Sequence, residues 1–230
     1  MHIKGLQKLT LLDYKGLLSA TIFTGGCNFT CPFCHNKDLV LYPNAIPNLS
    51  EHKILDFLSE RRDRLEGVCI TGGEPTLQKD LPTFLHRIKA FGYQIKLDTN
   101  GTFPETIKQL VSNQLVDYIA MDIKNTREKY ASTIGCTQFD ITPITKSIDY
   151  LLQSHCAYEF RTTIVRELHS EQDIYSICQW IQGADAYYLQ PYVNSPQVIK
   201  PSFSSYTRKE LEHFQSIAMQ FVKKCDIIGL

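Results

Sequence analysis

Short apolar runs alternate with amphipathic segments along the chain, and this alternation restricts the possible folds more than any other feature. Six runs rich in β-branched and aromatic residues predict strands, at residues 20–24, 68–71, 93–98, 116–123, 158–165 and 186–189. Strands that alternate with helices in this way predict an α/β fold built from βα units. Because a complete barrel needs eight such units, we expect a single-domain partial TIM barrel, (β/α)6, with a parallel sheet open on one side.

Six amphipathic segments between or after these runs predict helices. Each has an apolar stripe or a start signal, and they begin near Ser50, Leu81, Pro104, Thr142, Ser170 and Thr207. The segment after Ser50 is expected to bury a helical face that extends to Leu65. Thr207 followed by Glu210 is typical of a capping box. We therefore expect one domain over residues 1–230, with a cluster loop at 25–36, a βα core at about 19–191, and a C-terminal lid and helix at about 192–230.

The charge balance narrows the classes of partner. The 230 residues carry 24 Lys and Arg against 24 Asp and Glu, and 43% of them are hydrophobic. A neutral chain of this kind argues against nucleic acid or an anionic membrane as the main partner. The first residues place lysines among the apolar side chains, unlike a signal peptide. We therefore expect a cytoplasmic protein whose eight cysteines stay reduced.

Three cysteines within eight residues give the strongest chemical signal. Cys27, Cys31 and Cys34 have the spacing C-x3-C-x2-C. A structural zinc site needs four ligands, and a c-type haem interpretation of Cys31–His35 needs an exported chain. The interpretation we favour is a [4Fe–4S] cluster, whose irons are ordinarily held by four thiolates. Three local thiolates leave one iron open to a ligand that is not protein.

The other five cysteines show no ligand spacing. They are scattered through the chain, at Cys69, Cys136, Cys156, Cys178 and Cys225. Free cysteine is often a small buried hydrophobe, and we expect these residues to be of that kind.

A second motif identifies a resemblance. Gly72-Gly73-Glu74-Pro75 follows the second predicted strand, and together with the cysteine loop it resembles the radical S-adenosylmethionine (SAM) superfamily. The N-terminal run over residues 5–14, residues 21–24 and the cluster loop over 31–36 are similar to the anaerobic ribonucleoside-triphosphate reductase activating proteins, which belong with the activators of glycyl radical enzymes. The resemblance implies a [4Fe–4S] cluster on Cys27, Cys31 and Cys34, with SAM on the open iron.

The same resemblance implies roles for polar residues at the ends of the strands. Those expected to contact the cofactor are Gly72, Gly73, Glu74, Asp98, Asn100, Lys124 and Arg161. Those expected to hold a monovalent cation, Na⁺ or K⁺, are Asp98, Thr99 and Asp122. The alternatives are a simple turn at Asp98–Asn100, a solvated charge pair between Asp122 and Lys124, and a core salt bridge at Arg161.

One position departs from the pattern of the activators. Some of them carry a histidine after the sixth strand, where this chain reads Leu189-Gln190-Pro191-Tyr192. The contact of that histidine is therefore absent or replaced, with Gln190 and Asn194 as the candidates.

The resemblance implies an oxidoreductase that reductively cleaves SAM and generates a glycyl radical on a partner, for which anaerobic ribonucleotide reductase is the first choice. An electron donor such as flavodoxin or ferredoxin is implied as well. The segment from Lys124 to Cys136 is expected to line an opening for a peptide loop of the partner, with an ordinary polar loop as the alternative. The alternatives are a 7-carboxy-7-deazaguanine synthase-like enzyme acting on a small molecule, and a zinc-binding module without activity.

Overall fold

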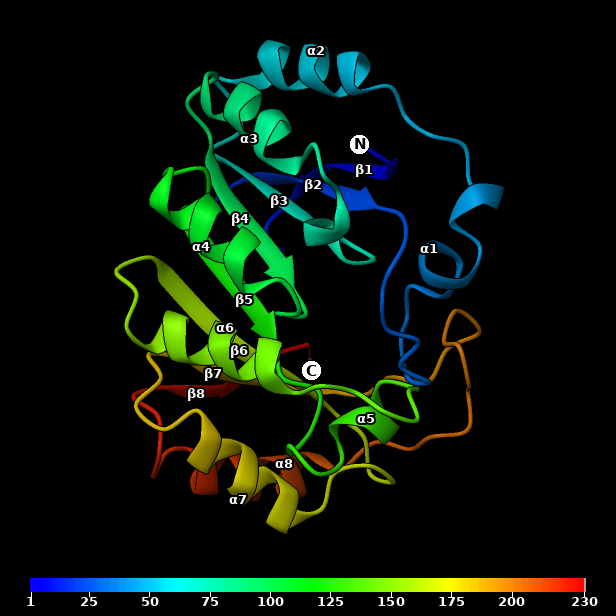
Figure 1. Ribbon diagram of the computed structural model, residues 1–230, viewed down its shortest axis with the longest axis vertical. Coiled ribbons are helices and arrows are strands. Elements are labelled where there is room, and N and C mark those ends of the chain that lie inside the picture. Colours follow the sequence, from blue (N-terminus) through cyan, green and yellow to red (C-terminus); the bar gives the residue numbers. More distant parts are fainter. Residues whose placement is uncertain (230) are drawn as a thin grey trace. The chain divides into compact units, whose positions relative to one another are not determined.

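A computed structural model describes residues 1–229 of the chain (Figure 1). The strands in this part are β1 (Ile3–Thr10), β2 (Ser19–Thr24), β3 (Gly67–Gly72), β4 (Gln94–Thr99), β5 (Tyr118–Asp122), β6 (Ala157–Ile164), β7 (Tyr187–Pro191) and β8 (Cys225–Ile227). The α-helices are α1 (Lys37–Leu41), α2 (Glu51–Arg61), α3 (Leu81–Lys89), α4 (Pro104–Ser112), α5 (Tyr130–Thr133), α6 (Thr142–Leu152), α7 (Glu171–Trp180) and α8 (Arg208–Ala218). Two short 3-10 helices are η1 (Pro43–Ala45) and η2 (Pro75–Leu77).

Strands that follow one another in the chain are also neighbours in the sheet, which has the order β1-β2-β3-β4-β5-β6-β7-β8. The pairs β2–β3, β3–β4, β6–β7 and β7–β8 are parallel, while β1 runs antiparallel to β2. The six predicted strands correspond to β2 through β7. Within the described residues the order starts at β1 and ends at β8, so the prediction of an α/β fold with an open, mainly parallel sheet is confirmed.

Two strands were missing from the sequence-based prediction. Most side chains of β1 between Lys4 and Leu9 are half-buried or exposed, so this edge strand buries little of the apolar surface from which strands are recognised. The last strand, β8, has only three residues, too few to show a periodic pattern. The prediction of six strands is therefore corrected to eight in the described part of the chain.

The chain divides into two compact units. The first comprises Met1–Asn28, Asp38–Thr99 and Phe103–Ile119, and the second comprises Phe29–Lys37, Asn100–Thr102 and Ala120–Leu230. In the first unit α2 and α3 lie side by side (Figure 1), and Leu58 and Phe84 are buried. Leu65 is buried as expected but lies beyond the end of α2 at Arg61, so its predicted place on this helix was wrong.

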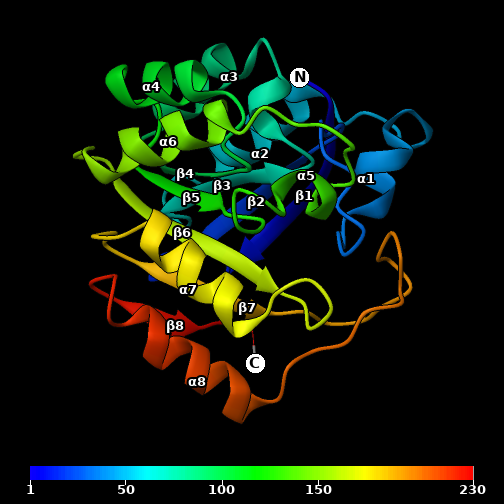
Figure 2. The ribbon, with the colours of Figure 1, turned by 60° about the horizontal axis from the view of Figure 1, so that its bottom comes forward.

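In the second unit α7 and α8 pack together (Figure 2). The rings of Tyr175 on α7 and Phe221, just after α8, meet edge to face with centroids 5.1 Å apart. A second aromatic group surrounds α5, where Tyr130 stacks on Phe139 at 5.7 Å and meets Trp180 of α7 at 6.2 Å. Aromatic pairs of this geometry stabilise beyond the area that they bury, so they fix the short α5 segment to α7.

Capping residues define the starts of α7 and α8. Ser170 with Asp173 and Thr207 with Glu210 form reciprocal capping boxes, which confirms the one predicted at Thr207. Ser50 occupies the N-cap position of α2 without a side-chain capping bond.

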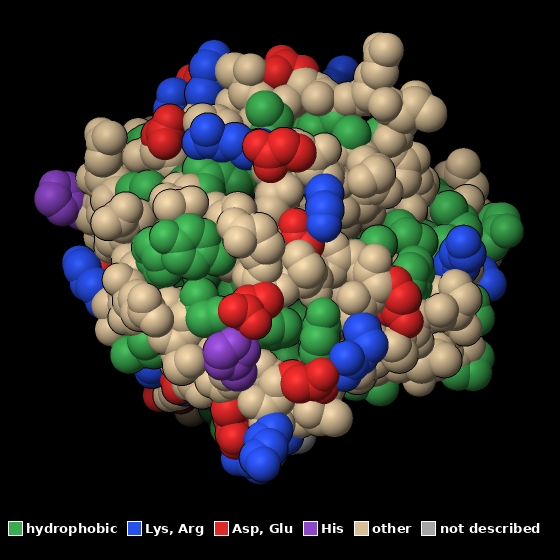
Figure 3. Space-filling view, turned by 90° about the horizontal axis from the view of Figure 1, so that it is seen from below, with side chains coloured by type: hydrophobic (Ala, Val, Ile, Leu, Met, Phe, Trp, Pro, Cys, Tyr) green, Lys and Arg blue, Asp and Glu red, His purple; other side chains and the backbone are tan. Residues whose placement is uncertain are grey.

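The surface carries both signs of charge. On the face in Figure 3, Lys and Arg side chains are scattered among Asp and Glu, in agreement with the zero net charge of the sequence. Among residues 1–229, no helix has both the length and the apolar character that crossing a membrane requires.

Replacing Thr207 with Ala is expected to lower the free energy of unfolding by about 1 kcal/mol, because the N-cap hydroxyl accepts a backbone bond at the start of α8. Urea denaturation followed by circular dichroism measures this change. Thr207→Ser keeps the hydroxyl and should remain within about a few tenths of a kcal/mol of the wild type, because serine and threonine are both preferred N-cap residues. Equal losses in both variants would contradict the role of the cap.

Candidate functional site

In the first unit, the turn after β3 packs against the backbone that leads to Cys27. The N–H groups of Gly73 and Glu74 donate to the carbonyls of Thr24 and Gly26, each at 2.8 Å. A Cβ on Gly73 would lie 2.0 Å from the Gly26 oxygen, far inside van der Waals contact. The glycine is therefore required for this close approach of two backbones.

The Glu74 carboxylate is buried within the same turn, with 1% of the residue exposed. Its Oε1 accepts bonds from the backbone N–H of Thr76 at 3.1 Å and from the hydroxyl of Thr99 at 2.8 Å, and the Thr76 hydroxyl donates to it as well. Glu74 and Thr99, predicted from different motifs, are thus brought together. Buried carboxylates are stable only when hydrogen-bonded in this way.

Asp98 faces a buried lysine that sequence reasoning missed. Lys96 Nζ lies 3.2 Å from Asp98 Oδ1 and donates to the Asp13 carbonyl at 2.7 Å. The Thr71 hydroxyl donates to Asp98 Oδ2 at 3.2 Å. The signal was present in the sequence, because residues two apart in a strand share a face. A lysine two positions before a functional aspartate in a buried strand indicates an ion pair.

The second unit contains a charged cluster at the end of β5. Asp122 Oδ1 accepts from Arg161 Nε at 2.9 Å, and its Oδ2 accepts from Lys124 Nζ at 2.8 Å. Arg161 Nη1 also lies 3.9 Å from Glu159 Oε1. Burial alone would raise the pKa of Asp122, but the charges of Arg161 and Lys124 outweigh it and lower that pKa to about 2. Three predicted residues from β5, β6 and the segment between them therefore form one ionic group.

Two of the three predicted cluster ligands lie beside this group. Burial favours the neutral amine of Lys124, yet the negative charge of Asp122 and of the Cys31 and Cys34 thiolates raises the pKa of Lys124 above its usual range. Burial raises the pKa of the Cys34 thiol, while Lys124 and the Asn36 N–H, 3.4 Å from Sγ, act in the opposite direction. The lysine thus supplies the charge that favours thiolates here.

Backbone hydrogen bonds hold the loop around Cys31 and Cys34 from two sides. The N–H groups of Ile199 and Lys200 donate to the carbonyls of Cys34 and Pro32, at 3.1 and 2.8 Å. On the other side, Thr30 N–H donates to the carbonyl of Ile134 at 3.0 Å. The segment predicted as a C-terminal lid therefore fastens this loop within the second unit. We call residues 192–205 the strap.

His35 adds a side-chain contact to the strap. Its Nε2 lies 2.5 Å from the carbonyl of Val193, and its ring packs against Tyr192 with centroids 5.8 Å apart. Of the residues considered for the missing histidine, Asn194 uses its side-chain oxygen to accept from the Tyr192 hydroxyl at 3.2 Å.

His169 is a second residue that the sequence analysis missed. It is fully buried, its Nε2 donates to the carbonyl of Lys124 at 2.8 Å, and its Nδ1 accepts from the Val165 N–H at 3.1 Å. Burial lowers the pKa of this imidazole, which favours the neutral ring that these two bonds require. Its position before a helix start gave no chemical signal in the sequence.

The remaining predicted residue in this unit, Asn100, forms a local turn. Its Oδ1 accepts from the backbone N–H of Thr102 at 3.0 Å and from the hydroxyl of that residue. Gly101 has a φ of +79°, and a Cβ there would lie 2.0 Å from Met121 Cε. Asn100 is thus set at the start of a turn that packs against β5.

The scattered cysteines agree in part with the expectation of small buried hydrophobes. Cys69, Cys178 and Cys225 are buried, and burial raises the pKa of Cys178 and Cys225 to about 12. Cys136 and Cys156 are only partly buried.

Replacing Asp122 with Asn is expected to change the pH dependence of stability. Because its pKa falls from 3.8 in the unfolded chain to about 2 in the folded protein, the carboxylate stabilises above pH 4 and loses this contribution as the pH falls toward 2. Between pH 5 and pH 3 the wild type should lose about 1 kcal/mol more than the variant. Urea unfolding at both pH values measures the loss of stability. The control is Asp149→Asn, at an exposed position of α6. Equal losses of stability in the wild type and both variants would contradict the ionic group.

Replacing Gly73 with Ala is expected to lower the free energy of unfolding by about 1–3 kcal/mol, because backbone atoms must move to admit the added methyl group. Thermal unfolding measures the loss. At Gly5 the added carbon would meet the Phe23 side chain at 3.3 Å, so Gly5→Ala is a milder matched control. Similar stability of both variants would show that the Gly26 backbone moves aside easily.

Comparisons with known proteins agree on the family. The model of the Radical SAM superfamily matches residues 21–177. A predicted glycyl-radical enzyme activating enzyme of Methanocaldococcus jannaschii is 36% identical over 195 residues, which cover 83% of this chain and 79% of that protein. A 7-carboxy-7-deazaguanine synthase of Thermoplasma acidophilum is 33% identical over 111 residues, covering 48% of this chain and 49% of that protein.

Solved structures show the same fold. A crystal structure of SuiB from Streptococcus suis bound to S-adenosylmethionine has a TM-score of 0.70 and 14% sequence identity, over 88% of this chain and 48% of SuiB. This chain thus spans about half the length of SuiB, and at this identity the likeness concerns the fold alone. The family match and the long alignment to the archaeal relative establish that the chain is an enzyme of the radical SAM superfamily and belongs with the glycyl-radical enzyme activating enzymes.

Proposed function

We propose that this enzyme generates a glycyl radical on a partner protein, and that the partner is an anaerobic ribonucleoside-triphosphate reductase. The observation that carries the first part is the 36% identity to the archaeal glycyl-radical enzyme activating enzyme, which extends over most of both chains. The second part rests on the resemblance of the N-terminal run and of the loop over residues 31–36 to the reductase activating proteins.

Family membership implies a [4Fe–4S] cluster and SAM, and the residues present fit this pair. Thiolates are the ligands that iron–sulfur clusters take, and Cys27, Cys31 and Cys34 are the proposed ligands. In the second unit the Lys124 ammonium lies near Cys31 and Cys34 and compensates negative charge on these thiolates. When bound, these cofactors supply the radical chemistry, the reductive cleavage of SAM to methionine and a 5′-deoxyadenosyl radical.

The chain's own residues bind and orient SAM in this proposal. Gly72 and Gly73 allow a close backbone approach, and Glu74, held rigid by Thr76 and Thr99, accepts from the methionine amino group. Arg161 and Lys124 are the cations proposed for the carboxylate or ribose, with Asp122 holding both side chains in place. Asp98 and Asn100 complete the proposed set.

The monovalent cation site stays a prediction, because cationic side chains already face the carboxylates that were expected to hold the ion. Its expected ligands are Asp98, Thr99 and Asp122, but Asp98 already faces Lys96, and Asp122 faces two cationic side chains. A Na⁺ or K⁺ ion would share these carboxylates with lysine and arginine. Activity in potassium, sodium and choline buffers decides whether the ion is needed.

A further part of the proposal concerns the electron donor and the domain organisation of the chain. The electron donor is proposed to be a flavodoxin or a ferredoxin. The whole chain is proposed to act as one radical SAM domain, in which the strap secures the cluster loop.

Anaerobic reconstitution with iron and sulfide, followed by reductant, SAM and the reductase, tests the proposal. We expect 5′-deoxyadenosine together with a glycyl radical signal in electron paramagnetic resonance. Abundant cleavage of SAM with no radical on the reductase would contradict that partner, and no cleavage at all would contradict the activity itself.

Replacing Cys27, Cys31 or Cys34 with Ala is expected to abolish iron loading and 5′-deoxyadenosine formation while circular dichroism stays close to that of the wild type. The matched control is Cys156→Ala, a partly buried cysteine outside the loop, which should load iron normally. Retained iron and cleavage in all three loop variants would place the cluster elsewhere.

A second candidate is a radical SAM enzyme that acts on a small molecule. The alignment to the 7-carboxy-7-deazaguanine synthase favours it, but covers only 48% of this chain. Turnover of a pterin-like substrate in the absence of any protein partner would support this candidate over the activator.

A further inference from the structure

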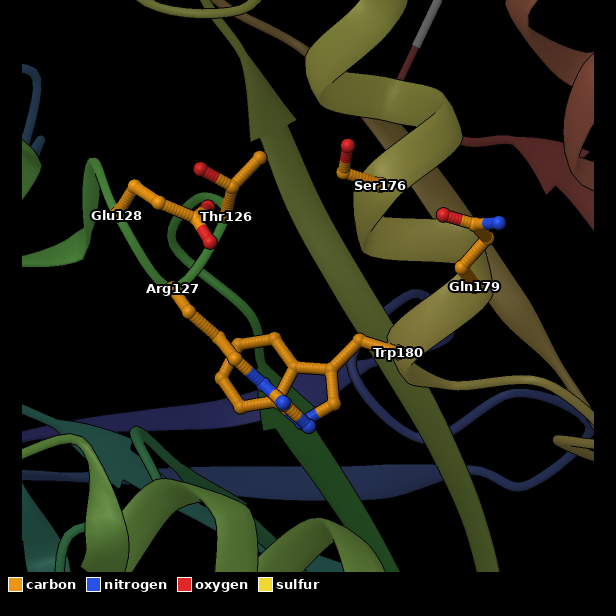
Figure 4. Close-up of a pocket in the computed structure, with 6 residues that line it drawn as sticks. All are labelled: Thr126, Arg127, Glu128, Ser176, Gln179 and Trp180. Atoms are coloured by element: carbon orange, nitrogen blue, oxygen red, sulfur yellow. The ribbon is translucent and has the colours of Figure 1, made fainter.

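A polar pocket of about 310 Å³ lies in the second unit, between the segment that follows β5 and helix α7. Its lining residues come from these two places only, namely Thr126, Arg127, Glu128, Ser176, Gln179 and Trp180. Figure 4 shows the Arg127 side chain laid across the Trp180 indole, with Ser176 and Gln179 projecting from α7 and with Thr126 and Glu128 on the opposite wall. Three of its lining residues, 126–128, belong to the segment from Lys124 to Cys136, which the sequence analysis expected to line an opening for a peptide.

The charged groups of this pocket have no ionic partner within residues 1–229. The Arg127 guanidinium carbon lies 4.8 Å from the centre of the Trp180 ring, a cation–π contact, and no carboxylate of the described chain is within salt-bridge distance of it. Glu128, next in the chain, likewise makes no salt bridge there. Neighbouring Lys129, by contrast, pairs with Asp173 at 2.6 Å. The pocket therefore presents one cation and one anion that are available to a ligand.

The walls of the pocket are held in place by buried hydrogen bonds. Asn125 Nδ2 donates to the Thr133 hydroxyl at 2.9 Å and to the Leu168 carbonyl at 3.0 Å. His169 fixes the carbonyl of Lys124, and Lys129 pairs with Asp173 on α7. A site whose walls are fixed beforehand loses less entropy when a ligand binds.

The chemistry of the lining favours a polypeptide. Arg127 and Gln179 offer donors for carboxylate or carbonyl oxygens, and Glu128 offers an acceptor for N–H groups, so the pocket matches a chain that carries both. A simple anion such as phosphate would meet Arg127 but would be repelled by Glu128. Arginine stacked on an aromatic ring keeps its planar donor edge free for bidentate bonding to a carboxylate.

The location links this pocket to the proposed active site. Arg127 stands three residues after Lys124, which pairs with Asp122 and lies near the Cys31 and Cys34 thiols. We propose that this pocket binds an acidic segment of the protein partner. In this arrangement Arg127 donates hydrogen bonds to a carboxylate of the segment, and Glu128 accepts one from a backbone N–H. This inference rests on the proposed function, because it takes the substrate to be a polypeptide.

The single tryptophan of the chain makes the test direct. Since Trp180 is the only tryptophan, its fluorescence reports on this pocket alone. The full chain is titrated through the millimolar range with acetyl-Gly-Gly-Glu-Gly-amide, with the matched peptide in which Gln replaces Glu, and with inorganic phosphate. We expect saturable binding of the Glu peptide and about tenfold weaker binding, or worse, of the Gln peptide, because the Gln peptide loses a charge-assisted bond. Phosphate should also bind about tenfold more weakly or worse, because it has no backbone N–H to offer Glu128 and is repelled by that carboxylate.

Variants of the protein then test whether Arg127 is the residue that binds the carboxylate of the peptide. Arg127→Gln should weaken binding of the Glu peptide about tenfold or more, and Arg127→Lys should recover only part of the loss, because lysine lacks the planar fork. Arg208→Gln, at an exposed arginine of α8 paired with Glu212, is the matched control and should bind as the wild type does. Calorimetry with the same peptides confirms that each fluorescence change reports binding.

Four results would overturn the inference. Equal affinity for the Glu and Gln peptides, or no saturable change with either, would show that the pocket does not recognise an acidic segment. Phosphate binding as tight as the peptide would indicate a simple anion site, and an unaltered Arg127→Gln variant would place the peptide elsewhere. Because these titrations need neither iron nor SAM, their failure is distinct from failure of the proposed radical activity.

Discussion

The ionic group at the end of β5 is the constraint on which the chemistry of the second unit depends. Asp122 stands between Arg161 and Lys124, and any one of these charges would be costly to bury alone. Together they fix the Lys124 ammonium beside a pair of cysteines whose thiolates need positive charge nearby. The same lysine is fixed through its backbone by His169. Under the proposed function, charge compensation and cofactor binding use the same side chains, and a change at one of them would alter both.

In the first unit, close packing of two backbone segments holds the candidate site residues in place. The turn after β3 lies directly against the carbonyl that precedes Cys27, and no side chain fits between them. The Glu74 carboxylate is held in place by donors from Thr76 and Thr99. A carboxylate held in this way keeps its orientation while remaining an acceptor, which suits the proposed role toward a protonated amine.

The sequence predicted those parts of the molecule that depend on local patterns. Strands β2 to β7 were recognised because they are apolar and buried, and the capping box at Thr207 because it depends on two residues three apart. The edge strand β1 escaped recognition, since half-buried side chains carry little hydrophobic signal. Lys96 was overlooked although its pairing with Asp98, two residues further along the same strand, is a local pattern. His169 escaped for another reason, because its partner, the Lys124 carbonyl, is distant in the chain and no local pattern shows it.

The strap holds the cysteine loop largely through main-chain atoms, since the N–H groups of Ile199 and Lys200 meet the carbonyls of Cys34 and Pro32. Any residue except proline can supply such an amide hydrogen. Side chains at these two positions are therefore free to diverge among relatives without loosening the loop. A comparison of aligned sequences would undervalue this part of the chain, and its contribution is visible only in three dimensions.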